Sequence, residues 1–252
     1  MEHLEGRQSV LAALNAFQRR FHVILIRQGI HDERVADVVA AAAERGVPVR
    51  HVPREELDAL AHGATHGGVL AICSAKPRWS ADDLLKSLDG RRRPPLLLLV
   101  EGVDDARNLG FTLRTADACG VDAVLIKKHL WDFDAVDVAR PASGAYERLP
   151  LVQIDTVEPL KALQRRGVQL VGCIARARRT IYEIELTRPT ILAIGGEKRG
   201  LSGAVRDHCD LLATIPTRDG ASLSLSHAAA IVMAEAMRQR QGDSQRDAGT
   251  TN

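Results

Sequence analysis

The stretch Leu96-Leu-Leu-Leu-Leu-Val100 is an uninterrupted apolar run that ends at Glu101-Gly102. A run of this length and composition is typical of a strand buried on both faces of a parallel sheet. Four more runs follow, at residues 121–126, 168–173, 190–194 and 211–215, with helical stretches between most of them and a last helix over 225–240. This alternation predicts an α/β fold in which helices cover both faces of a parallel sheet.

The first 75 residues have a pattern of their own. Apolar spacing predicts helices over 4–14, 32–45 and 55–61, and strands over 21–26, 47–52 and 69–73, which together make a compact α/β unit. Residues 76–94 contain Pro77, Pro94 and an arginine triplet, and they predict a linker with one short helix around 82–88. The expected organisation is a domain over 1–75, a linker over 76–94, a second domain over 95–241 and a disordered polar tail over 242–252.

Composition narrows the class of protein. The formal net charge is only +2, so any affinity for nucleic acid must come from local basic patches, and aromatic residues make up 3%, which argues against a base-stacking RNA-recognition sheet. The four cysteines are widely spaced without a C-x-x-C pair, which predicts unpaired thiols in a reducing compartment. The chain shows no secretory signal and no apolar stretch of about 18 residues. We therefore expect a cytoplasmic protein, or a matrix form lacking its presequence, without membrane contact.

Ligands in open α/β sheets bind beyond the carboxyl ends of the strands, and three segments of the chain lie there. The first is Asn108-Leu-Gly-Phe-Thr-Leu-Arg114. Asn108 is predicted to cap a helix, with Asp104 or Asp105 in the preceding turn. Arg114 is predicted near the edge of the buried stripe of that helix, where a solvated charge is less expected. The alternative is an ordinary surface arginine.

The second segment is Ile194-Gly-Gly-Glu-Lys-Arg-Gly200, whose two glycines at a strand end would let backbone amides approach a ligand. Its spacing fits neither a phosphate-binding P-loop nor a dinucleotide fingerprint, and a plain glycine-rich turn is the alternative. The third segment is Ile215-Pro216 followed by Ser222-Leu-Ser-Leu-Ser226, for which helix capping is the alternative.

Histidine-based chemistry has little support. His227 follows the third segment, but no G-x-S-x-G elbow accompanies it, so a serine-hydrolase interpretation is weak. His62 and His66 are four residues apart among glycines that disfavour a helix, and a metal site built from these two is improbable. No metal is expected.

Taken together and in this order, the three segments resemble the SpoU/TrmH branch of the SPOUT methyltransferases. The motif N-x-G-x-x-x-R is matched by Asn108, Gly110 and Arg114, and the G-x-E core by Gly195, Gly196 and Glu197. The third motif, I-P followed by S-L-N-V-S, is matched by Ile215, Pro216, Ser222, Leu223 and Ser226. One position departs, because Ser224 stands where the family has asparagine. The first 75 residues resemble the L30e-like substrate domain of members that include 23S rRNA guanosine 2′-O-methyltransferases.

The resemblance implies a deep trefoil knot in the second domain, a homodimer, and S-adenosylmethionine as cofactor. It implies methyl transfer to a ribose 2′-hydroxyl of RNA, most directly a guanosine of 23S rRNA. It assigns cofactor contacts to Gly195, Gly196, Ile215 and Leu223, and catalysis to Arg114, Asn108, Glu197, Ser222 and Ser224.

The family account gives Arg114 the role of stabiliser or of base. A guanidinium is a poor proton acceptor, so we favour electrostatic stabilisation of the developing oxyanion or the adjacent phosphate. Glu197 could fix Arg114, and Asn108 could orient the ribose. RNA contacts are expected from the basic runs at 91–93, 127–128 and 176–179.

Three alternatives stay open at this point. One is a SPOUT RNA-binding protein that has lost catalysis, with Ser224 as its mark. Another is a methyltransferase that acts on tRNA. A nucleotide-binding oxidoreductase is the third, and the missing dinucleotide fingerprint disfavours it.

Overall fold

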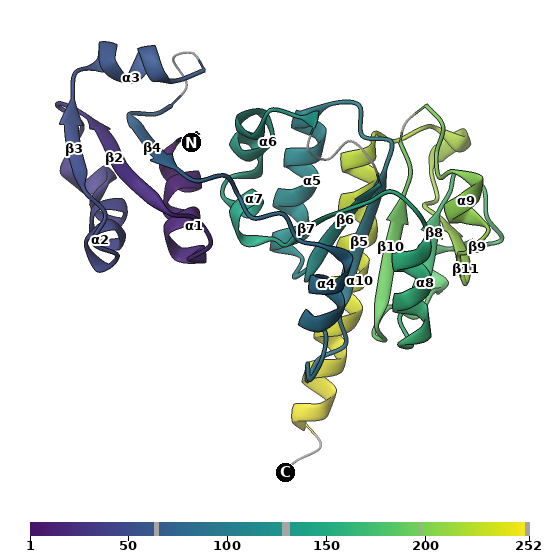
Figure 1. Ribbon diagram of the computed structural model, residues 1–252. Coiled ribbons are helices and arrows are strands. Elements are labelled where there is room, and N and C mark those ends of the chain that lie inside the picture. The colour runs from purple at the N-terminus through teal and green to yellow at the C-terminus, as the bar shows by residue number, and fades with distance from the viewer. Residues whose placement is uncertain (63–65, 128–131, 197, 250–252) are drawn as a thin grey trace. The chain divides into compact units, whose positions relative to one another are not determined.

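The computed structural model describes residues 1–62, 66–127, 132–196 and 198–249 (Figure 1). The chain forms two compact units. The first comprises Met1–Arg78 together with Asp134–Arg148, and the second comprises Trp79–Phe133 together with Leu149–Asn252. The chain therefore passes between the units three times.

The first unit contains a four-stranded mixed sheet in the order β1-β4-β2-β3. β2 pairs antiparallel with β4 and parallel with β3, while β1 pairs antiparallel with β4. The strands are β1 (Glu2–Glu5), β2 (Phe21–Arg27), β3 (Val49–Val52) and β4 (Val69–Cys73). The helices are α1 (Arg7–Ala16), η1 (Asp32–Arg34), α2 (Ala36–Glu44) and α3 (Arg54–Leu60).

The start of the chain differs from its prediction, because a strand occupies the beginning of the expected helix over 4–14. Leu4 and Glu5 are buried in β1, and Gly6 then turns the chain with φ of 89° before α1 begins at Arg7. This positive φ suits glycine, which lacks a Cβ. The apolar spacing at Leu4 and Val10 was compatible with one continuous helix, and only the pairing of β1 with β4 breaks it.

Two short helices from the middle of the chain also belong to the first unit: α6 (Ala135–Ala142) and α7 (Ala145–Arg148). Glu147 of α7 accepts hydrogen bonds from both Nε and Nη2 of Arg19 at 2.8 Å, and both side chains are 1% exposed. The sequence analysis included this segment in a domain over 95–241, whereas its contacts group it with the first unit. An ion pair between residues 128 positions apart leaves no local pattern in the sequence, so this grouping could not be predicted.

The second unit contains a seven-stranded sheet in the order β7-β6-β5-β10-β8-β11-β9, and all its strand pairs are parallel. This confirms the predicted α/β class. The strands are β5 (Leu96–Glu101), β6 (Ala123–Lys127), β7 (Leu151–Ile154), β8 (Gln169–Cys173), β9 (Arg179–Thr180), β10 (Thr190–Ile194) and β11 (Leu211–Thr214). The prediction missed β7 and β9, which are only four and two residues long.

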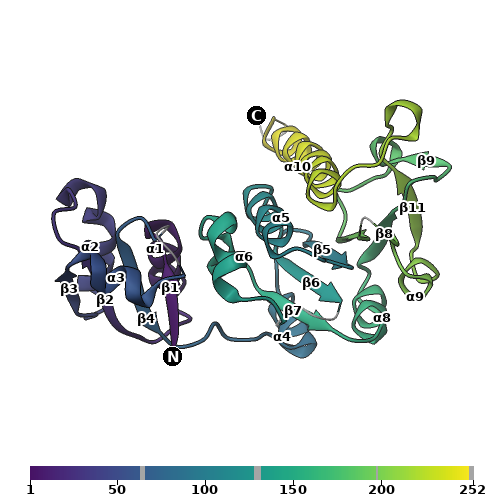
Figure 2. The ribbon, with the colours of Figure 1, turned by 90° about the horizontal axis from the view of Figure 1, so that it is seen from above.

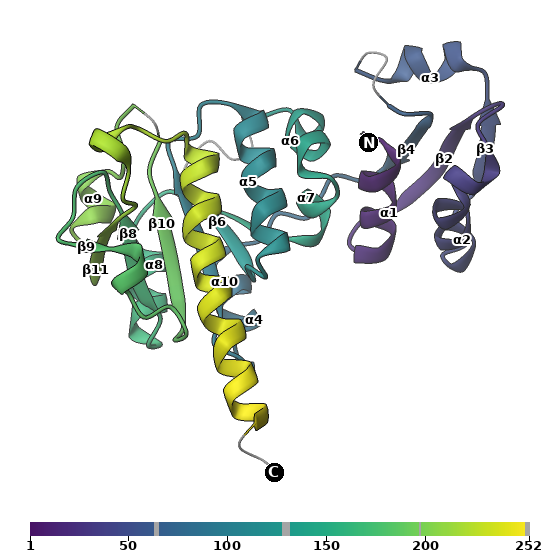
Figure 3. The ribbon, with the colours of Figure 1, turned by 180° about the vertical axis from the view of Figure 1, so that it is seen from behind.

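Helices cover both faces of this sheet, as predicted (Figures 2 and 3). α4 (Ala81–Ser87) and α8 (Glu158–Arg165) pack on one face, and α5 (Ala106–Ala118) and α10 (Leu225–Gly249) lie side by side on the other. Shorter elements complete the unit: η3 (Ile181–Glu183), α9 (Gly203–Arg206) and η4 (Arg218–Gly220). In the described part of the chain, no helix is long and apolar enough to cross a membrane.

α10 continues to Gly249, past residue 242, where the sequence predicted a disordered tail. A helix that is already nucleated by packing extends at little cost, which the local polarity of this segment does not reveal. The trefoil knot implied by the resemblance stays a prediction, because strand order and pairing do not by themselves define a knot.

Candidate functional site

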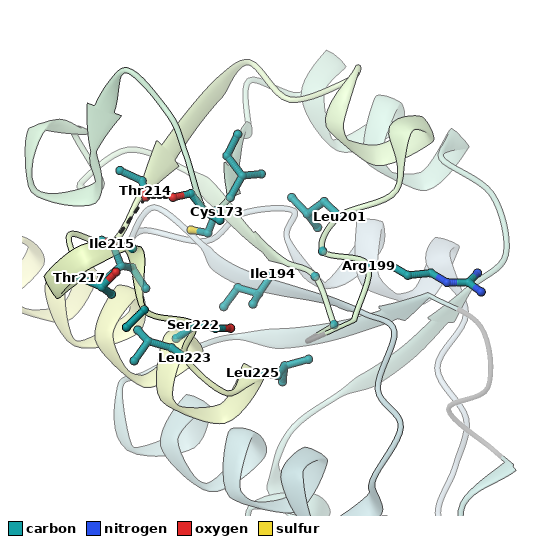
Figure 4. Close-up of a pocket in the computed structure, with 18 of the residues that line it drawn as sticks. Cys173, Ile194, Arg199, Leu201, Thr214, Ile215, Thr217, Ser222, Leu223 and Leu225 are labelled. Carbon is teal, nitrogen blue, oxygen red and sulfur yellow. Dashed lines mark hydrogen bonds between the residues drawn. The ribbon is translucent and has the colours of Figure 1, made fainter.

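A cavity of about 420 Å³ opens at the carboxyl ends of β8, β10 and β11 (Figure 4). Its walls are the segments that directly follow these three strands, together with the turn before α10. The described lining residues are Cys173, Ile174, Ala175, Ile194, Gly195, Gly196, Arg199, Gly200, Leu201, Arg206, Thr214, Ile215, Thr217, Gly220, Ala221, Ser222, Leu223, Leu225 and Ala228. Its size falls within the range of small-molecule sites, and its place fits the rule for open α/β sheets.

The lining combines apolar side chains with hydroxyl and basic groups. Ile194, Leu223 and Leu225 offer apolar walls, and Thr217 adds a hydroxyl. Burial raises the pKa of Cys173 to about 12, so its thiol is neutral at physiological pH. None of the described lining residues is acidic, whereas two are arginines. Such a cavity suits a ligand that has a flat apolar part and an anionic end.

Five predicted site residues meet at this cavity: Gly195, Gly196, Ile215, Ser222 and Leu223. They belong to the second and third predicted segments and are up to 28 residues apart in sequence (195 to 223). The parallel sheet brings the carboxyl ends of β10 and β11, which precede these segments, to one edge. The fold therefore unites the second and third predicted segments in one place. The assignment of individual roles to these residues stays a prediction.

Asn108 lines a smaller cavity of about 200 Å³ next to the first. The turn between β5 and α5 and the side chain of Lys198 form this second cavity, and Leu225 lines both. Lys198 Nζ lies 3.2 Å from Asp104 Oδ2. This exposed ion pair joins the loop after β10 to the turn between β5 and α5. The first predicted segment thus begins beside the cavity that the other two form.

The predicted helix cap at Asn108 is wrong. Asp105 is the N-cap of α5, and its Oδ1 accepts a hydrogen bond of 2.7 Å from the Arg107 backbone amide. Asn108 lies in the first turn of the helix, which begins at Ala106. A carboxylate is as good a cap as an asparagine amide, and the sequence offered both. The side chain of Asn108 is therefore not needed to cap α5.

Two other predicted catalytic residues, Arg114 and Ser224, stand apart from the cavities. Arg114 is exposed on α5 and is not among the residues that line either cavity. Ser224 lies just before α10, also outside both linings, and its Oγ is 2.5 Å from His227 Nδ1 and 3.2 Å from Ser226 Oγ. Glu197 lies outside the described residues.

The two glycines after β10 have a physical reason beyond the predicted approach of a ligand, which stays a prediction. A Cβ at Gly195 would lie 1.9 Å from the Gly200 carbonyl carbon, and a Cβ at Gly196 would lie 2.3 Å from the Gly102 oxygen. Both positions thus demand glycine because backbone packs against backbone, whether or not a ligand is bound. The Gly200 amide donates to the Gly196 oxygen at 2.8 Å, which closes this loop on itself.

The basic runs predicted to bind RNA differ in where they lie. Arg91 and Arg93 both pair with Asp122, whose Oδ2 also accepts from the Leu96 amide at the start of β5. That is the amino end of the sheet, opposite to the cavity, so this run lies away from the site, and its contact with RNA stays a prediction. Lys128 lies outside the described residues.

The remaining two runs also separate. Lys127 is 11% exposed and pairs with Glu101, so it is not available to a phosphate. The arginines at 176, 178 and 179 are exposed and directly follow the cavity-lining segment 173–175. Among the described residues of the three runs, those at 176–179 have the position that an RNA contact near the cavity requires.

The histidine pair singled out in the sequence is engaged elsewhere. His66 Nε2 lies 2.8 Å from Asp58 Oδ1, and its Nδ1 accepts a hydrogen bond from the Gly68 amide. His62 Nδ1 lies 3.1 Å from Glu5 Oε1. Among the described residues, no group of three or more His, Cys, Asp or Glu could hold a metal ion.

The sequence did not single out Leu225 and Thr217 as cavity-lining residues, or Glu101 and Ser202 beside the cavity. The feature that they share in the sequence is a position near the end of a strand or the start of a helix, which many other residues have as well. The contacts of Glu101 become visible only in three dimensions.

Comparison with known proteins gives matches over both units. The SpoU rRNA Methylase family matches residues 95–234, and the family described as RNA 2′-O ribose methyltransferase substrate binding matches residues 3–79. The 23S rRNA (guanosine-2′-O-)-methyltransferase RlmB of Pseudomonas putida is 37% identical over 96% of this chain and 98% of its own length. RlmB of Escherichia coli (strain K12) is 33% identical over 95% and 99%.

Solved structures agree on the fold. A crystal structure of an RNA 2′-O ribose methyltransferase has a TM-score of 0.77 at 27% identity and covers 95% of this chain and 88% of its own. The SpoU methyltransferase AviRb from Streptomyces viridochromogenes, solved in complex with the cofactor AdoMet, has a TM-score of 0.78 at 23% identity, with coverage of 95% and 90%.

Proposed function

We propose, because this chain belongs to the SpoU rRNA methylase family, that it transfers a methyl group from S-adenosylmethionine to the ribose 2′-hydroxyl of a guanosine in 23S rRNA. The observation that carries the proposal is the meeting of Gly195, Ile215 and Leu223 at one cavity of ligand size, with Asn108 in the cavity beside it. The sequence motifs and the site geometry thus support the same activity.

The residues that line the larger cavity fit this cofactor. Ile194, Ile215 and Leu223 can enclose the flat adenine ring, and Gly195 and Gly196 line the same cavity without side chains. The two lining arginines suit the carboxylate of the methionine part. When bound, the cofactor supplies an activated methyl group on a positively charged sulfur.

The chain's own residues have to position the ribose and stabilise the charge that develops on its 2′-oxygen. We assign the orientation of the ribose to Asn108, which lines the cavity that shares Leu225 with the cofactor site. Arg114 lies on the same helix, six residues or about 9 Å further along its axis. Its exposure suits a contact with RNA, and we assign it the stabilisation of the oxyanion or the adjacent phosphate. As the oxygen–methyl bond forms, the carbon–sulfur bond would break to leave a neutral thioether, and the proton of the 2′-hydroxyl would pass to water.

Phosphate contacts are assigned to Arg176, Arg178 and Arg179, which are exposed beside the cavity. Neutralising phosphates releases counterions, so RNA binding should weaken as salt rises.

We also propose that the protein works as a homodimer in the cytoplasm, where its rRNA substrate is found. Sedimentation of the purified chain tests this.

The experiment that tests the activity uses the full chain, labelled cofactor and 23S rRNA from a strain that lacks the gene. Digestion and mass spectrometry should find 2′-O-methylguanosine at one position. Methylation of tRNA but not of 23S rRNA would identify the other substrate class. Cofactor binding without methylation of either RNA would instead identify an RNA-binding protein that has lost catalysis.

A further inference from the structure

A nearly buried ion pair lies beside the cofactor cavity and has no part in the mechanism above. Lys127 Nζ, at the end of β6, lies 2.6 Å from Glu101 Oε1 at the end of β5. Their side chains are 11% and 12% exposed. Lys127 Nζ also donates to Ser202 Oγ at 2.9 Å, and Ser202 donates its backbone amide to Glu101 Oε2 at 2.7 Å. We call these three residues the Glu101 cluster.

The Glu101 cluster reaches the loop that forms one wall of the cavity. Gly195, Gly196, Gly200 and Leu201 line the cavity, and Ser202 is the next residue and the N-cap of α9. The carboxylate therefore fixes the far end of the loop by a hydrogen bond to its backbone. Hydrogen bonds to a charged acceptor are roughly twice as strong as neutral ones, so the bond from the Ser202 amide to Glu101 Oε2 is a strong one.

The near end of the loop is fixed by the neighbouring residue. Gly196 packs so closely on Gly102 that a Cβ at Gly196 would lie 2.3 Å from the Gly102 oxygen. The consecutive residues Glu101 and Gly102 thus hold both ends of the loop, and the Gly196–Gly200 hydrogen bond closes it between them. A shift of the Glu101 side chain would move Ser202 and the cavity wall beside it.

Charge balance makes Lys127 necessary in this arrangement. Burial by itself would raise the pKa of Glu101, but the hydrogen bonds from Lys127 and Ser202 outweigh it and keep that pKa below its usual value. Without the ammonium group, a poorly solvated carboxylate would lose its partner, which is costly enough to drive it toward water. Glu101 would then release the Ser202 amide.

We propose that Glu101 and Lys127 are positioning residues of the cofactor site, which hold residues 195–196 and 198–202, the described parts of the loop after β10, in the arrangement that binds S-adenosylmethionine. The inference rests on the proposed function, because it assumes that this cofactor occupies the cavity. It assigns the pair an effect on cofactor affinity and none on the transfer step itself.

The test is calorimetric binding of S-adenosylhomocysteine, the demethylated product, to the full chain and to Lys127→Met and Glu101→Gln. Loss of one charged hydrogen-bonding contact should weaken binding by about tenfold or more in each variant. With saturating cofactor, kcat should stay within about twofold of the wild type, because the reacting groups are untouched. Lys161→Met is the matched control, since Lys161 forms an exposed ion pair with Glu158 at 2.7 Å on α8, away from the cavity.

A charge-reversed double variant separates loop anchoring from general stability. Glu101→Lys combined with Lys127→Glu restores an ion pair between β5 and β6 but leaves the Ser202 amide without its acceptor at position 101. Thermal stability should recover, while affinity stays low. Recovery of affinity would show that the ion pair alone matters and would overturn the anchoring role.

Two further outcomes distinguish the inference from the proposed function. Wild-type affinity in both single variants overturns the inference alone. A wild-type protein that binds neither S-adenosylhomocysteine nor S-adenosylmethionine overturns the proposed function. If Lys127→Met unfolds, the near-isosteric Glu101→Gln decides the matter by its dissociation constant.

Discussion

Replacing Gly195 by alanine separates two reasons why a glycine stands at the end of β10. If the glycine only leaves room for the cofactor, Gly195→Ala should fold normally and lose cofactor binding. If backbone packing demands it, the variant should be destabilised even without ligand. The structure favours the second reason, because the added Cβ would lie 1.9 Å from the Gly200 carbonyl carbon and 2.1 Å from the Leu201 nitrogen.

The size of the effect follows from these distances. Ordinary carbon–carbon contact begins near about 3.5 Å, so the loop would have to move by about 1.6 Å. Both contacts are with backbone atoms, which cannot rotate away as a side chain does. Overpacking of this kind costs about 1–3 kcal/mol, and loss of the Gly200–Gly196 hydrogen bond about 0.5–1.5 kcal/mol more. A total of about 1.5–4.5 kcal/mol corresponds to a fall in Tm of roughly 3–18 °C for a chain of this size.

The assay is thermal unfolding of the ligand-free protein, followed by calorimetric titration with S-adenosylhomocysteine. Gly203→Ala is the matched control, because its added Cβ would only touch the Asp207 carboxylate at 3.9 Å within α9. That change should leave Tm level or raise it slightly, since alanine favours the helix. An unchanged Tm in ligand-free Gly195→Ala, with binding abolished, would refute the backbone explanation.

Three other changes test the site. Arg114→Ala should lower single-turnover methylation by about 10²–10³ while cofactor affinity stays near wild type, and near-normal turnover would remove Arg114 from the mechanism. Ser224→Asn should keep or raise methylation of 23S rRNA, measured as labelled methyl incorporated; an inactive wild type with an active variant would identify a lost activity. Glu101→Gln should lower Tm at neutral pH but not in acid: the pKa of Glu101 is depressed on folding, so its contribution is present above the ordinary value of 4.5 and fades as pH falls through the folded value. A Tm difference that does not shrink as the pH is lowered below 4.5 would contradict this.

Much of the fold could be predicted because the strands of the second unit are continuous apolar runs. Leu96–Glu101 and Thr190–Ile194 were located to within a residue, since a strand buried on both faces needs no polar position. β7 escaped prediction because four residues with Gln153 among them do not stand out from a loop. β1 escaped because its pairing with β4 joins residues that are about 70 positions apart, as in Glu2 with Cys73.

The candidate site divides in the same way. The sequence located Gly195, Ile215 and Leu223 at one edge of the sheet, because the carboxyl ends of parallel strands share that edge. It could not give the reason for Gly195, which lies in the distance to Gly200 across the loop. Nor could the sequence distinguish Lys127, which forms an ion pair with Glu101, from the exposed arginines at 176–179. A basic residue in a sequence gives no indication of whether an acidic partner lies beside it in the fold.

Ser224 shows why a single departure from a family motif does not decide whether activity is lost. A serine hydroxyl is shorter than an asparagine amide, but it offers one donor and two acceptor sites, and its direction depends on its neighbours. Here the Ser224 oxygen lies 2.5 Å from the His227 ring and 3.2 Å from Ser226 Oγ, so its orientation is set by one side chain of the motif and by the residue that follows it. The length and the planar amide of an asparagine side chain could fix the direction of its hydrogen bonds, whereas the direction of the Ser224 hydroxyl depends on His227. The pair has therefore to be tested as a unit, and His227→Ala should reduce methylation in the wild type but much less in Ser224→Asn.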